Sequence, residues 1–76
     1  MANSSVQIMW QRNAVVQAAS KSSPAVFMAL MESNTFQAGL DALDPECPCY
    51  VKDKGIAQCV YLGLMSMIDN LRDATS

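Results

Sequence analysis

The chain has 76 residues, of which 51% are hydrophobic and 16% are charged, and its formal net charge is −2. This composition excludes a disordered chain, and the length fits a single domain over residues 1–76. A weakly acidic chain without a basic cluster is a poor partner for nucleic acid, and the absence of histidine removes the commonest general base and metal ligand.

A first helix is predicted from Ser4 or Ser5 to about Ser20, after a disordered tail over residues 1–4. An alternative for residues 6–10 is a short strand, because β-branched and aromatic residues gather there. A helix that is apolar on two sides needs two partners, and a short monomer offers few. The apolar residues of this segment are Val6, Met9, Trp10 and Val16 on one side and Ile8, Val15 and Ala19 on the other.

Two short helices are predicted next, over about 24–33 and 35–43. Ser23 can cap the first of them, with Pro24 at the first helical position, where a missing amide is harmless. The apolar residues of the two segments cannot share one face of a straight helix, which predicts a tight turn or kink at 33–34. Asn34 is expected to be the N-cap of the second helix, with Gln37 completing a variant of the capping box.

This helix–turn–helix spacing also resembles that of a DNA reader. The second of these helices would lie in the groove, yet it contains no lysine or arginine and carries aspartate. DNA recognition requires the opposite charge, so a small DNA-binding regulator ranks last among the functions considered.

A surface connection of about a dozen residues is expected after Asp44 and Pro45. It contains Cys47 and Cys49, and Cys59 follows in the next helix. Three readings stay open: a metal site, a disulfide from Cys47 or Cys49 to Cys59 worth roughly 3 kcal/mol, or incidental thiols with Cys59 as a small core residue. An odd number of cysteines favours a reducing compartment, the cytoplasm.

The longest helical pattern covers residues 56–71, with Asp53 as its expected N-cap and 73–76 as a loose tail. Its apolar run is too short for a bilayer, which takes about 20 residues. Apolar groups extend nearly all the way round, which is typical of a helix buried on more than one side. The predicted core stripe is Ile56, Val60, Leu64, Met67 and Leu71, flanked by Ala57, Tyr61 and Ile68, and a row of small residues beside it is Cys59, Gly63, Ser66 and Asn70.

Together these patterns predict an all-α fold, a small bundle of three to four helices with a long C-terminal helix at its centre. A core of this size rarely supplies more than about 3–5 kcal/mol, so the excess apolar surface is expected to be buried in a homodimer.

The favoured function is a non-enzymatic adaptor, regulator or inhibitor that binds another protein through an apolar helix surface. No phosphate loop, nucleophile–base pair or dinucleotide fingerprint is present, and neither a cofactor nor a membrane partner is expected. By compactness alone, the chain resembles phage- or plasmid-encoded modulators of host proteins. The runner-up is a redox- or metal-responsive module that uses Cys47, Cys49 and Cys59. The predicted interface residues are Ile8, Trp10, Val15, Met28, Met31, Leu62 and Met65.

Overall fold

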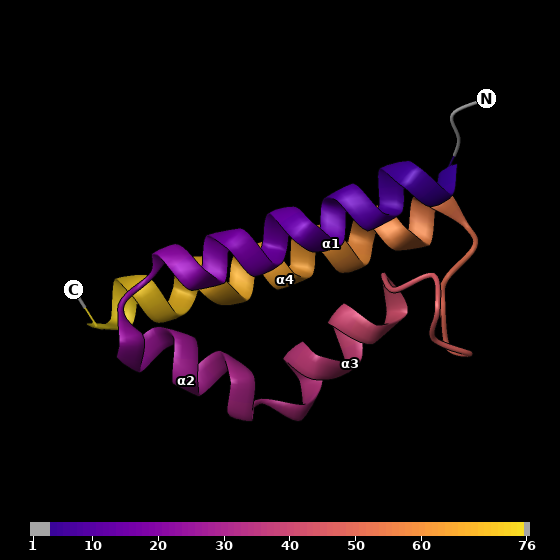
Figure 1. Cartoon of the computed structure of the whole chain (residues 1–76). Coiled ribbons are helices and arrows are strands. Elements are labelled where there is room, and N and C mark those ends of the chain that lie inside the picture. The colour runs from indigo at the N-terminus through magenta and orange to yellow at the C-terminus, as the bar shows by residue number, and fades with distance from the viewer. Residues whose placement is uncertain (1–3, 76) are drawn as a thin grey trace.

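The computed structural model describes the backbone of residues 4–75 and the side chains of residues 11–74. Over this range the chain forms four α-helices and no strand, which confirms the predicted all-α class. The helices are α1 (Ser4–Lys21), α2 (Pro24–Glu32), α3 (Asn34–Ala42) and α4 (Lys54–Thr75) (Figure 1). None of the described helices combines the length and apolar content needed to cross a bilayer.

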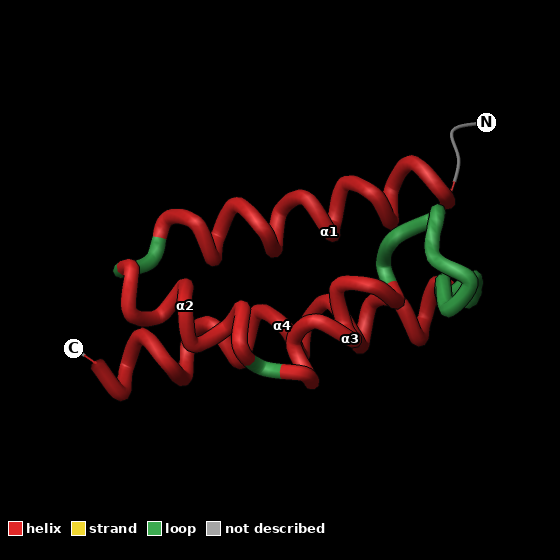
Figure 2. The backbone as a smooth tube through the Cα atoms, turned by 60° about the horizontal axis from the view of Figure 1, so that its bottom comes forward, coloured by secondary structure: helices red, strands yellow, loops and turns green. Residues whose placement is uncertain are grey.

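The helices form a small bundle with three parts, which are α1, the pair α2 and α3, and α4. The second part is interrupted between α2 and α3. The two long helices, α1 and α4, run in the same direction side by side, and α2 and α3 together form the return between them (Figures 1 and 2). Helix α4 contacts each of the other three helices. The C-terminal helix therefore has the central place that the sequence predicts.

Residue Ser33 separates α2 from α3 and serves both of them. Its extended backbone ends α2, with its amide donating to the Leu30 carbonyl at 3.1 Å, while its hydroxyl accepts from the Phe36 amide at 3.2 Å. The N-cap of α3 is thus Ser33, and the prediction of Asn34 was wrong by one residue. The Gln37 side chain does not close a capping box either, because its Nε2 donates to the Met31 carbonyl at 3.1 Å.

The core forms where one face of each helix meets the others. Every fully buried residue with a described side chain is apolar. In α4 the buried residues are Leu64, from the predicted stripe, and Ala57 and Ile68, from its predicted flank, so the buried line is rotated relative to the predicted stripe. Ile56, its first predicted member, is 55% exposed. The core residues are Val15, Ala19, Val26, Leu30, Phe36, Leu40, Leu43, Ala57, Leu64 and Ile68.

Gly39 allows α3 to lie close against α4. A Cβ atom built at Gly39 would be only 2.6 Å from Cδ2 of Leu64 and 3.1 Å from its Cγ. A glycine in the middle of a helix lowers its stability, and here its function is the close approach of two helices. No pattern in the sequence indicated this contact.

The connection from α3 to α4 is held at both of its ends. The Val51 amide donates to the Ala42 carbonyl at 2.9 Å, and Asp53 caps α4 by accepting from the Ile56 amide at 3.0 Å, as predicted. Helix α4 continues to Thr75, so the expectation of a loose tail from Asp73 onward was wrong for residues 73–75.

Candidate functional site

Between residues 55 and 68, the side of α4 that points away from the core is uncharged and partly apolar. Since Ala57, Leu64 and Ile68 face inward, residues about half a turn away from them face solvent. Ile56, in the first turn of α4, is 55% exposed, and Leu62, two turns further along, is 54% exposed. We call this surface the α4 outer face, and it consists of Gly55, Ile56, Gln58, Cys59, Leu62, Gly63 and Ser66.

The small residues of this helix lie on the same face. Cys59, Gly63 and Ser66 are exposed, as is Asn70. The open side of Gly63 meets no atom within 4 Å of an ideal Cβ position. At Gly63, the predicted row for close helix approach is therefore not contacted by any side chain that the structure describes.

Two of the predicted interface residues remain accessible. Leu62 lies on the α4 outer face, and Met28 of α2 is 60% exposed. Met31 and Met65 are only half-buried but pack against the core, so each is shared between core and surface.

The remaining predicted interface residues all come from α1. Val15 has no exposed surface and belongs to the chain's own core, so it cannot be reached by a partner in this fold and is dropped from the interface. The side chains of Ile8 and Trp10 lie outside the described range.

The loop contains a second chemical feature, a disulfide bond between Cys47 and Cys49. Their Cα atoms are 5.2 Å apart, and the Cys49 amide also donates to Cys47 Sγ at 3.3 Å. Cys59 is free and exposed. Two of the three roles considered for Cys59, a bridge to a loop cysteine and a place in the core, are therefore wrong.

This pairing changes what the cysteines can do. A bond across one intervening residue closes a turn and does not connect the loop to α4, so it stabilises less than the longer bridge considered from the sequence. Among residues with described side chains, no three cysteine, aspartate or glutamate groups are gathered as metal ligands would be. What the arrangement offers chemically is thiol–disulfide exchange at an exposed loop.

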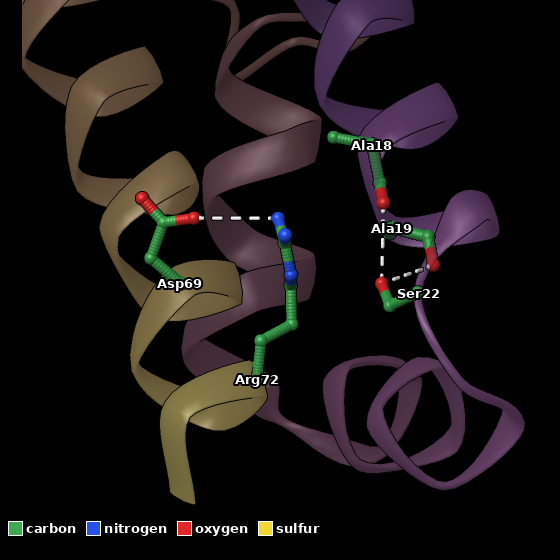
Figure 3. Close-up of polar contacts among 5 residues, drawn as sticks. All are labelled: Ala18, Ala19, Ser22, Asp69 and Arg72. Carbon is green, nitrogen blue, oxygen red and sulfur yellow. Dashed lines mark hydrogen bonds and ion pairs between the residues drawn. The ribbon is translucent and has the colours of Figure 1, made fainter. Parts of the chain in front are cut away.

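A hollow of about 570 Å³ lies where the turn between α1 and α2 meets the end of α4. Its lining includes Lys21, Ser22, Arg72 and Asp73, so both signs of charge are present. The Ser22 hydroxyl is occupied in donating to the carbonyls of the last turn of α1, at 2.7 and 3.1 Å, and Arg72 pairs with Asp69 at 3.6 Å (Figure 3). Nothing in this hollow selects a ligand of one charge.

Comparison of the chain with known protein families, with curated proteins and with solved structures finds no match.

Proposed function

We propose that this chain is a non-enzymatic protein-binding domain, a regulator, adaptor or inhibitor, whose α4 outer face is covered by another polypeptide. The observation that carries the proposal is the exposure of Ile56 and Leu62 on an uncharged face of the central helix. Exposed apolar surface of this kind, when contiguous, is typical of protein contact sites.

Two further features support a binding role over a catalytic one. The hollow at the end of α4 is open and has a mixed charge, whereas catalytic pockets usually enclose the substrate with a few convergent polar groups. Among the described residues no buried side chain is polar or charged, so this part of the chain holds no shielded acid, base or nucleophile.

The test compares the proteins retained by the immobilised wild-type chain with those retained by Leu62→Glu. A carboxylate in the middle of the α4 outer face would have to be buried by any partner, so the specific partner should be lost. Ala38→Glu is the matched control, since it adds the same charge at an exposed residue of α3. Retention of the same proteins by all three chains, with helix content unchanged by circular dichroism, would contradict the proposal.

A second candidate function, a redox-responsive module, is favoured by the Cys47–Cys49 bond. An incoming thiolate would attack one of the two sulfurs, form a mixed disulfide and release the other as a thiolate. The test replaces Cys47 and Cys49 by serine. If the chain is only a protein-binding domain, the amount of partner retained should not change. If it is a redox-responsive module, the retention of partner by the wild-type chain should depend on added reductant, and this dependence should be lost in the variant.

A further inference from the structure

The segment from Asp44 to Tyr50 consists of two consecutive turns that meet at Cys47. The Cys47 amide donates to the Asp44 carbonyl at 3.0 Å, and the Cys47 carbonyl accepts from the Tyr50 amide at 2.9 Å. Pro48 stands at the first central position of the second turn, where its fixed φ is favoured, and Cys49 stands at the next position. Backbone hydrogen bonds therefore fix Cys47 on both sides.

The second turn is also held against the body of the fold. Tyr50 and Val51 pack against the hydrophobic core, and the Val51 amide donates to the Ala42 carbonyl at 2.9 Å. These contacts do not involve the sulfur atoms, so we expect the turn to keep its shape when the disulfide opens. The sulfur of Cys47 then stays beside the backbone amide of Cys49.

The two sulfurs of the disulfide have different surroundings. Cys47 Sγ accepts a hydrogen bond from the Cys49 amide at 3.3 Å, while Cys49 Sγ accepts none in the part of the chain whose side chains are described. Cys47 is half-buried and Cys49 is exposed. In thiol–disulfide exchange the attacked sulfur must be accessible, and the other sulfur must leave with negative charge. Exposure favours attack at Cys49, and the amide favours departure of Cys47, so both differences select the same direction.

We propose that Cys49 is a thiol-modification site, at which a small thiol such as cysteine or glutathione becomes bonded while Cys47 leaves. The thiolate of the incoming molecule attacks Cys49 Sγ with its electron pair, and a new S–S bond forms as the bond between Cys49 and Cys47 breaks. The electron pair of the broken bond remains on Cys47 Sγ as a thiolate, so the small thiol is the only co-reactant. The Cys49 amide donates to this thiolate, and hydrogen bonds to ionised acceptors are about twice as strong as neutral ones.

The inference rests on the redox-responsive candidate function, since it names the class of molecule that would act on the loop and the sulfur that would receive it. Exchange quenched by acid tests it in the isolated chain. The background is the full chain with Cys59→Ser, which removes the third cysteine. The oxidised chain is mixed with reduced glutathione at neutral pH and quenched early in the reaction, because acid protonates the thiolates and stops further exchange.

Mass spectrometry with fragmentation between the two cysteines then locates the glutathione. Cys49 should carry it in about a five- to tenfold excess over Cys47, because a hydrogen bond to a charged group shifts an equilibrium by about tenfold or more and the charge is only partly developed during attack. Equal amounts on the two cysteines, an excess on Cys47, or no adduct at all would overturn the proposal.

Pro48→Gly tests the cause of the preference. Glycine frees the backbone between the two cysteines, so the Cys49 amide is no longer held beside the Cys47 sulfur, and the excess should fall by about twofold or more. Pro24→Gly is the matched control at the start of α2 and should leave the excess unchanged, with circular dichroism to check the helices. An excess that is the same in Pro48→Gly as in the background would overturn the role of the amide.

The redox-responsive function fails on a different result. If glutathione is found on Cys49 but the retention of a partner does not depend on reductant, the modification site stands and that function is removed. If retention depends on reductant but glutathione is found on Cys47, the function stands and the direction of exchange proposed for Cys47 and Cys49 is wrong.

Discussion

Two glycines with opposite surroundings allow a quantitative test of the packing. In either helix, replacement of glycine by alanine should gain about 1 kcal/mol of stability from helix propensity. At Gly63 nothing opposes the gain, because no atom lies within 4 Å of the added Cβ. At Gly39 the Cβ would lie 2.6 Å from Cδ2 of Leu64, a side chain only 3% exposed, and such overpacking costs about 1–3 kcal/mol.

We therefore expect Gly63→Ala to raise the free energy of unfolding by about 1 kcal/mol. Gly39→Ala should leave it unchanged or lower it by as much as about 2 kcal/mol, the overpacking penalty less the propensity gain. A change of 1 kcal/mol corresponds to about 4–8 °C in the melting temperature of a domain of this size. Urea unfolding followed by circular dichroism, at a concentration where the chain is monomeric, measures both variants.

The control for this pair is Leu64→Ala. When the Leu64 side chain is shortened, the space beside Gly39 opens, and Gly39→Ala should then become stabilising. Equal stabilisation by Gly39→Ala and Gly63→Ala in the wild-type background would refute the close approach of α3 to α4.

Three other outcomes follow from single contacts. Phe36→Ala, at a side chain with no exposed surface, should lower the free energy of unfolding by about 3–5 kcal/mol and leave the chain largely unfolded by circular dichroism; a cooperative melt near that of wild type would contradict the core. Ser33→Ala removes the acceptor for the Phe36 amide and should lower the free energy of unfolding by about 1 kcal/mol. The control is Ser20→Ala, at an exposed serine of α1, which should change that free energy by less than about 0.5 kcal/mol. Equal effects of the two substitutions would refute the role of Ser33 as a cap. Alkylation of the unfolded, unreduced chain should modify Cys59 alone, and modification of Cys47 under the same conditions, read by mass spectrometry, would exclude the loop disulfide.

Local signals in the sequence predicted much of the backbone. Ser23 before Pro24 and Asp53 before α4 have the residue types that satisfy free amides at helix starts, and both act as caps in the structure. The break between α2 and α3 was predicted because the apolar residues of the two segments cannot lie on one face of a single straight helix. Its cap was misplaced by one residue, because Ser33 and Asn34 are both good N-caps and only the backbone angles decide between them.

The faces of α4 could not be read from periodicity alone. Apolar residues surround most of this helix, so several inward directions fit the pattern almost equally well, and Ile56 was placed in the core by mistake. What decides the direction is the position of α1, α2 and α3, which is tertiary information. The Cys47–Cys49 bond was not among the pairings considered from the sequence, which were bridges from either loop cysteine to Cys59.

The proposal that the α4 outer face is covered by another polypeptide, together with the expectation of a homodimer, is tested most directly by sedimentation equilibrium over a wide range of concentrations. The wild-type chain should move from the monomer mass of 8.2 kDa toward twice that value as concentration rises, while Leu62→Glu should stay at the monomer mass with the same helix content. A wild-type chain that remains monomeric at every concentration, or a Leu62→Glu chain that associates as strongly, would contradict the account.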